Sequence, residues 1–132
     1  MIVLDASVLI AHFDSNDAHH AYADQLLVKV ADQQLSASPI TLAEVLVGPA
    51  HAGKLSRAQD ALRQLDIDSV SLPEDAPARL ATLRAKTHLK LPDCCVLLAA
   101  EQARAAIATF DDQLAASAQD LGFSVWTRRS RK

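Results

Sequence analysis

The sequence has only three glycines among 132 residues (Gly48, Gly53 and Gly122), and they are widely spaced. Phosphate-binding loops of the P-loop and Rossmann types need several closely spaced glycines, so both kinds of nucleotide site are excluded. No apolar stretch approaches the roughly 20 residues that span a bilayer. The N-terminus also lacks a basic segment before its first apolar run, so we expect no signal peptide and a cytoplasmic protein.

Cysteine is also scarce, because the chain has only Cys94 and Cys95, which are adjacent. A disulfide bond between neighbours within a helix is sterically poor, so we expect two reduced thiols in the core. The five histidines are scattered and lack the Cys/His spacing of a zinc site. The sequence gives no basis for a Ser-His-Asp or Cys-His catalytic arrangement.

The chain is mildly acidic, with 13 basic and 16 acidic residues and a net charge of −3. Four of the positive charges stand in the last five residues, at Arg128, Arg129, Arg131 and Lys132. The remaining chain has 9 basic and 16 acidic residues, a net charge of −7. So acidic a body is not a general nucleic-acid binder, and a polyanion would need a local basic patch or a bound metal ion. We expect residues 1–127 to form one domain and residues 128–132 a disordered basic tail.

Half of the residues are apolar, and short apolar runs alternate with longer segments of helical periodicity. The predicted strands are residues 1–4, 35–38, 67–72, 106–110 and 123–126. The predicted helices are residues 7–13, 18–34, 42–46, 55–65, 76–89, 93–105 and 113–121, and we expect the third of them to end or kink at Gly48-Pro49. This alternation favours an α/β fold with a parallel sheet covered on both faces. The 93–105 helix is apolar nearly all round, which is typical of a central helix.

Four acidic residues stand where a parallel sheet would bring them to one edge: Asp5, Glu44, Asp93 and Asp111. Two of them follow predicted strands, two lie near helix starts, and ligands of open α/β sheets bind at the carboxyl ends of the strands. Carboxylates about 5 Å apart would repel by roughly 3 kcal/mol per pair at an effective dielectric of 20. Such a cluster needs protonation, a basic partner or a cation. Oxygen ligands favour Mg²⁺ or Mn²⁺, and a site of this kind suits phosphodiester hydrolysis.

Two of these acids also have simpler structural explanations. Asp5 could cap the helix that begins near Ser7. Thr41 and Glu44 match the Thr-x-x-Glu capping box, with Thr41 as the N-cap. Because Glu44 is the single charge in an apolar run, we expect it to be at least partly buried.

The other two acids have structural explanations as well. Asp93 follows Pro92 at a helix start, where the helix dipole favours negative charge. Asp111 and Asp112 follow a strand together, and we assign the cap of the next helix to Asp112. Taken jointly these explanations weaken, because in a parallel sheet all of these positions lie at the same edge.

Four segments, in this order, resemble the PIN-domain ribonucleases, and within them the VapC-type toxins of bacterial type II toxin–antitoxin pairs. The segments are IVLDASVLI at 2–10, ITLAEV at 40–45, LPDCCVLLAA at 91–100 and ATFD at 108–111. The resemblance implies an α/β/α sandwich with a short, mainly parallel sheet, and Mg²⁺- or Mn²⁺-dependent hydrolysis of RNA. By position it makes the four acids catalytic and metal-binding, with Ser7 and Thr109 as the small polar residues beside them. One departure is the pair Cys94-Cys95, where smaller or aliphatic residues are more usual.

The resemblance also implies a homodimer and a cognate antitoxin whose C-terminal segment wraps the toxin. RNA could be held by basic side chains before Asp93, namely Arg79, Arg84, Lys86 and Lys90. From these we select Arg84 and Lys86 as substrate-binding residues. The alternative is an ordinary solvated helix face.

Two other functions fit acids at a parallel-sheet edge. One is a Mg²⁺-dependent phosphotransfer module of the receiver or phosphatase type. The phosphatase form would need a second Asp two residues after the first, where this chain has Ser7. The other is a noncatalytic scaffold that keeps the PIN-like fold for binding.

Overall fold

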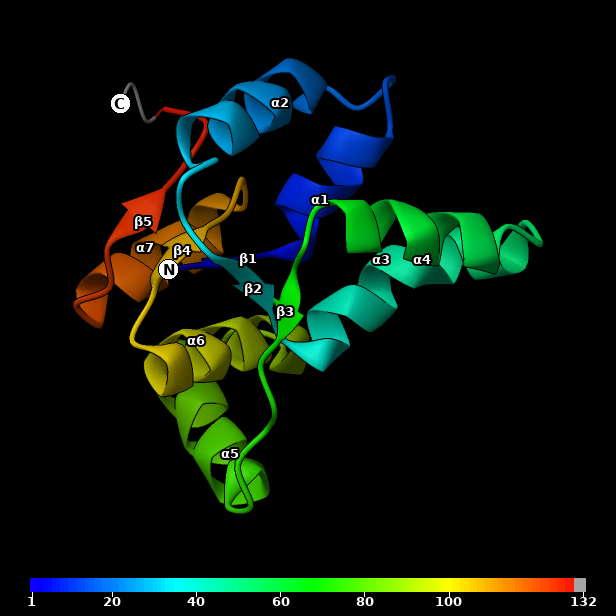
Figure 1. The fold of residues 1–132 in the computed structure, drawn as a ribbon. Helices are drawn as coiled ribbons and strands as arrows, with labels where there is room; N and C mark the ends of the chain where they lie inside the picture. Colours follow the sequence, from blue (N-terminus) through cyan, green and yellow to red (C-terminus); the bar gives the residue numbers. More distant parts are fainter. Residues whose placement is uncertain (130–132) are drawn as a thin grey trace.

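A five-stranded sheet, parallel at every strand pair, forms the centre of the computed structural model, which describes residues 1–129 (Figure 1). The strands lie in the spatial order β3-β2-β1-β4-β5. Their bounds are β1 Ile2–Leu4, β2 Leu35–Ala37, β3 Asp68–Ser69, β4 Ala106–Ala108 and β5 Val125–Trp126. The helices are α1 Ala6–Phe13, α2 His20–Lys29, α3 Pro39–His51, α4 Leu55–Gln64, α5 Ala76–Thr87, α6 Leu91–Ala103 and α7 Asp112–Asp120. The predicted α/β class and parallel sheet are confirmed.

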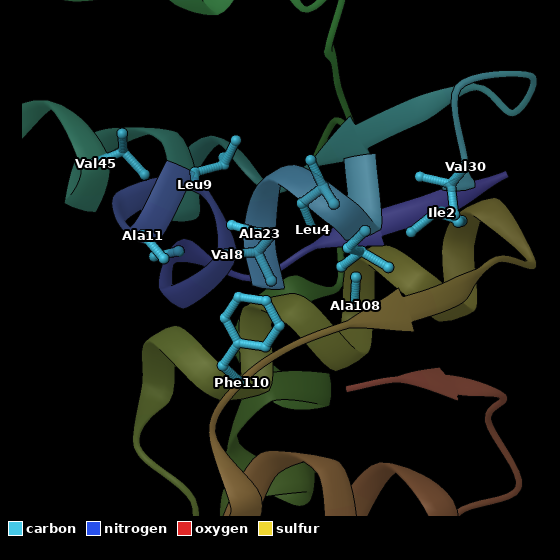
Figure 2. Packing of buried hydrophobic residues seen from close by; sticks show 12 residues of the cluster. Ile2, Leu4, Val8, Leu9, Ala11, Ala23, Val30, Val45, Ala108 and Phe110 are labelled. Atoms are coloured by element: carbon cyan, nitrogen blue, oxygen red, sulfur yellow. The ribbon is translucent and has the colours of Figure 1, made fainter. Parts of the chain in front are cut away.

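The strands present alternate side chains to two helical layers, as the period of two in a strand requires. Ile2 and Leu4 pack into a core with α1, α2 and part of α3 (Figure 2). Val3 and Ile107 face the opposite core, formed with α6 and α7. The structure is therefore a three-layer sandwich, and the two cysteines are free and buried in α6, as predicted.

The chain reverses its progress across the sheet at β1. From β1 it continues to β2 and β3 on one side, and then returns through α5 and α6 to β4 on the other. The boundary between β1 and β4 is therefore a topological switch point, and ligands of such sheets bind outside the carboxyl ends of the strands there. Asp5 directly follows β1, and Thr109 directly follows β4, so these residues flank the switch point.

Helix α3 begins earlier than predicted. Ser38 is its N-cap, with Oγ accepting a hydrogen bond from the Ile40 N–H at 3.2 Å, and Pro39 occupies the first helical position. Thr41 lies inside the helix and is fully buried, and its hydroxyl has no hydrogen-bond partner within residues 1–129. The predicted capping box of Thr41 and Glu44 is therefore wrong.

The same helix continues through Gly48 and Pro49 to His51, beyond the predicted end. With α4 it forms a pair of helices that extends away from the sheet (Figure 1). No helix in the described part of the chain is long and apolar enough to cross a membrane.

The C-terminal segment also differs from the prediction. Arg128 and Arg129, expected in a disordered tail, form ion pairs with Asp112 at 3.6 Å and 3.5 Å. The remainder of the predicted tail, residues 130–132, lies outside the described residues.

The two candidate caps of α3 can be compared by mutation. Ser38→Ala removes the side-chain acceptor at the N-cap and should lower the free energy of unfolding by about 1 kcal/mol. Thr41→Val replaces a buried hydroxyl that lacks a partner, so it should be neutral or stabilising by up to about 1 kcal/mol. Urea denaturation measures both values. A larger loss for Thr41→Val than for Ser38→Ala would restore Thr41 as the cap.

Candidate functional site

Asp5 is a buried carboxylate held by two hydroxyl groups. It is 5% exposed, and its Oδ2 accepts hydrogen bonds from Ser7 Oγ at 2.6 Å and Thr109 Oγ1 at 2.8 Å. Although Asp5 stands at the N-cap position of α1, its side chain makes no capping hydrogen bond. The capping explanation is therefore excluded. Because both donors bind Oδ2, Oδ1 is the oxygen that would bind a further ligand.

Backbone groups of the turn after β4 orient these two hydroxyls. The Phe110 N–H donates to Ser7 Oγ at 3.0 Å, and the Asp111 N–H donates to Thr109 Oγ1 at 3.0 Å. Each hydroxyl accepts from the backbone and donates its own proton to Asp5, which suits an ionised carboxylate that can only accept. The network joins the carboxyl ends of β1 and β4 at the switch point.

Asp111 is the N-cap of α7. Its Oδ1 accepts from the backbone N–H groups of Gln113 at 2.9 Å and Leu114 at 3.1 Å. Asp112 is instead the first residue of the helix, so the predicted assignment of the cap to Asp112 is wrong. The β4 strand ends two residues earlier than predicted, and the helix starts one residue earlier. The capping role of Oδ1 leaves Oδ2 of Asp111 as the oxygen that would bind a cation.

Asp93 lies half-buried in the first turn of α6, and its environment raises its pKa from the ordinary 3.8 to about 6. The largest cause is desolvation, followed by the negative charges of Asp5, Asp111 and Glu44. A helix dipole acting alone would lower the pKa at this position, so the dipole explanation does not account for the shift. The charges of all three other predicted acids therefore act on Asp93.

Glu44 is one of the exposed residues of α3. Its carboxyl group is nevertheless partly desolvated, and this desolvation and the charge of Asp5 raise its pKa. The prediction that Glu44 is at least partly buried is therefore confirmed for its carboxyl group.

No lysine or arginine within residues 1–129 forms an ion pair with any of these four acids. Lys90, the exposed N-cap residue of α6, is the cation that lowers the pKa of both Glu44 and Asp93, but the net shift remains upward. In the sequence, Lys90 stands three residues before Asp93. This short spacing distinguishes Lys90 from the basic residues of α5 as a neighbour of the acids.

The two predicted substrate-binding residues lie on the last turn of α5. Arg84 donates to the backbone carbonyl of Leu89 at 2.8 Å, so its guanidinium group supports the α5–α6 connection. Lys86 is exposed. Arg79, on the same helix, pairs with Glu101 and donates to Gln102 at 2.8 Å, which ties α5 to α6.

The acids do not form a ready-made metal cage. In the described part of the chain, no group of three acidic, histidine or cysteine side chains is arranged to hold a metal ion. The carboxylate oxygens fit Mg²⁺ or Mn²⁺ by chemistry, but a cation would have to draw them closer together.

The fold and the acids lie within a recognised domain, because the sequence model of the PIN domain matches residues 2–119. The chain belongs to the PIN domain family. This confirms the family predicted from the four segments.

Solved structures of other proteins share this fold. One, a toxin–antitoxin complex from Klebsiella pneumoniae, is 26% identical over 99% of this chain and 100% of that chain, with a TM-score of 0.74. FitAcB from Neisseria gonorrhoeae is 24% identical over 97% and 98%, with a TM-score of 0.71. VapC20 of Mycobacterium tuberculosis, a toxin that cleaves the sarcin–ricin loop, is 16% identical over 93% and 96%, with a TM-score of 0.61. No curated protein sequence matches this PIN domain.

Asp93 makes the stability of the PIN domain depend on pH. Its folded-state pKa of about 6 exceeds the ordinary value of 3.8, so the folded state binds more protons within this window. Stability therefore falls as the pH rises through it. Asp93→Asn should raise the free energy of unfolding at pH 8 by about 1 to 2 kcal/mol, allowing for solvent screening, and much less at pH 4.

Urea denaturation at the two pH values measures this difference. The matched control is Asp120→Asn, which removes an exposed acid at the end of α7. It should lack the pH-dependent gain. Equal effects of Asp93→Asn at pH 4 and pH 8 would contradict the raised pKa.

The hydroxyl of Thr109 can be tested separately. Thr109→Val removes the donor to buried Asp5 and the acceptor for the Asp111 N–H, so we expect a loss of about 2 to 3 kcal/mol in the free energy of unfolding. Thr109→Ser keeps the hydroxyl and should lose only about 1 kcal/mol for its missing methyl group. If denaturation shows the two variants to be equally stable, the hydrogen bonds contribute little.

Proposed function

We propose that this PIN domain is a Mg²⁺- or Mn²⁺-dependent endoribonuclease, a hydrolase that cuts RNA phosphodiester bonds with Asp5, Glu44, Asp93 and Asp111. The observation that carries the proposal is the raised pKa of Asp93, on which the charges of the three other carboxylates act. Lys90 offsets this effect only in part. Carboxylates gathered beside a switch point, without a paired lysine or arginine among residues 1–129, suit a divalent cation.

The available oxygens support this choice of cofactor. Oδ1 of Asp5 and Oδ2 of Asp111 are the oxygens not used by the hydroxyl network or the α7 cap. Asp93 and Glu44 would complete the ligand set on binding. A divalent cation bound there would lower the pKa of the attacking water and neutralise charge on the phosphate.

The protein groups have separate roles in this scheme. Asp93, on which the charges of the three other carboxylates act, would be stabilised in its ionised form by a bound cation. Ser7 and Thr109 fix the orientation of Asp5 and thereby the direction in which Oδ1 points. Lys90, at the exposed start of α6, would contact a phosphate of the RNA.

We further infer that the chain is the toxin of a toxin–antitoxin pair in the cytoplasm, that it binds a cognate antitoxin protein, and that it forms a homodimer. The similarity over full length to a chain of the Klebsiella pneumoniae toxin–antitoxin complex supports the antitoxin partner. Membership of the PIN domain family favours a nuclease over the receiver- or phosphatase-type alternative. A noncatalytic scaffold would share the fold, so only an activity measurement separates it from a nuclease.

Cleavage of fluorescently labelled single-stranded RNA tests the nuclease assignment. The protein, purified without an antitoxin, should cut RNA with Mn²⁺ or Mg²⁺ and be inactive with EDTA. Asp5→Asn and Asp93→Asn should each reduce the rate by at least about 100-fold, because each removes a carboxylate from the cation site.

Asp120→Asn, prepared in the same way, should cut at the rate of the unmodified protein. It controls for a contaminating nuclease and for a general loss of negative charge. Metal-dependent cleavage that persists in both active-site variants would remove the assignment. A protein that binds RNA but never cuts it would favour the scaffold.

A further inference from the structure

A polar pocket lies between α2 and the segment that follows β5. It has a volume of about 620 Å³ and is lined by Tyr22, Gln25, Lys29, Thr127, Arg128 and Arg129. Figure 1 shows the chain after β5 passing close to α2, although the two are almost 100 residues apart in sequence. None of the residues lining this pocket belongs to the carboxylate site.

The pocket concentrates positive charge on an acidic protein. Lys29, Arg128 and Arg129 bring three cationic side chains to its walls. The two arginines share one carboxylate, that of Asp112, at 3.6 Å and 3.5 Å. Asp112 is itself exposed, so a competing anion could displace it. The two arginines therefore share a single negative charge, although the chain as a whole carries −3.

The pocket lies next to the carboxylate site. Strand β5 pairs in parallel with β4, so the residues that follow both strands emerge at the same edge of the sheet. Asp112, which the arginines contact, directly follows Asp111 of the carboxylate site. A polymer with its reacting phosphate at the acids could therefore place a neighbouring phosphate at the arginines.

Aromatic rings connect the two sites. His19 lies with its ring centroid 5.3 Å from that of Phe110 and 6.2 Å from that of Tyr22. Arg128 Nη1 lies 3.2 Å from His19 Nε2, and because a guanidinium group can only donate, Nε2 is the acceptor. Tyr22 is 46% exposed at the pocket. Exposed aromatic rings beside cations are the means by which proteins bind single-stranded nucleic acid.

We propose that this pocket binds the RNA strand beside the bond that is cut, with a phosphate held by Arg129, Arg128 and Lys29 and an adjacent base stacked on Tyr22. The proposal rests on the proposed nuclease function for its choice of RNA. The phosphate replaces Asp112 as the partner of the two guanidinium groups. This pocket, rather than Arg84 and Lys86 on α5, is then the main source of affinity for the substrate.

The test is RNA binding by fluorescence anisotropy, in EDTA so that no cleavage occurs. A labelled single-stranded RNA and a polyphosphate chain of similar charge, added as competitor, are compared. Arg129→Gln should raise the Kd for both anions by at least about threefold and reduce the slope of log affinity against log salt by about 0.7. Tyr22→Leu should raise the Kd for RNA by at least about fivefold and leave polyphosphate within about twofold.

Arg63→Gln is the matched control, because Arg63 is an exposed arginine on α4 that pairs with Asp60. It should leave both Kd values within about twofold of those of the unmodified protein. If Arg129→Gln and Tyr22→Leu leave RNA affinity unchanged, the pocket does not bind RNA. If Tyr22→Leu raises the Kd for polyphosphate as much as the Kd for RNA, the proposed stacking of a base on Tyr22 is wrong.

The two proposals can fail separately. If both substitutions weaken RNA binding but the protein never cleaves RNA in Mn²⁺, the nuclease proposal is refuted and the pocket proposal stands. If the protein cleaves RNA in Mn²⁺ but neither substitution changes its Kd for RNA in EDTA, the nuclease proposal stands and the pocket proposal is refuted.

Discussion

The carboxylate of Asp5 joins the two halves of the sheet through a pair of hydroxyl groups. Ser7 reaches it from the start of α1, and Thr109 reaches it from the end of β4. The same hydroxyls hold the backbone of Phe110 and Asp111, so the turn that contains the next acid is fixed by the first. A buried carboxylate without such donors would be strongly destabilising, which couples the folding of this edge to the geometry of the site.

Negative and positive charges lie close together at the carboxyl edge of the sheet, which the net charge of the chain does not reveal. Burial, and then the negative charges of the neighbouring acids, raise the pKa of both Asp93 and Glu44. One residue after Asp111, Asp112 lies against Arg128 and Arg129. The net negative charge of residues 1–127 excludes a general affinity for polyanions. An acidic protein could bind a polyanion only through a local basic patch, and Arg128 and Arg129 form such a patch.

Sequence patterns predicted the features that depend on local periodicity or on the order of motifs. These were the alternation of strands and helices, the central α6 and the positions of Asp5 and Asp111 after strands of the sheet. The helix caps were predicted less well, because Thr-x-x-Glu is a short pattern, and Pro39 at the first helical position was the better signal for a cap at Ser38. The exposure of Glu44 and the partners of Arg128 could not be predicted, because both depend on how distant elements pack.

The two thiols of α6 follow directly after Asp93, and they connect the core to the site in another way. Cys94 and Cys95 are free and buried, and this burial raises the pKa of both. Such thiols are protonated at neutral pH and react slowly with electrophiles while the helix stays packed. We therefore expect alkylation of these thiols in the native protein to require local opening of α6. The alkylation rate of Cys94 and Cys95 would therefore report how often the helix that holds Asp93 opens.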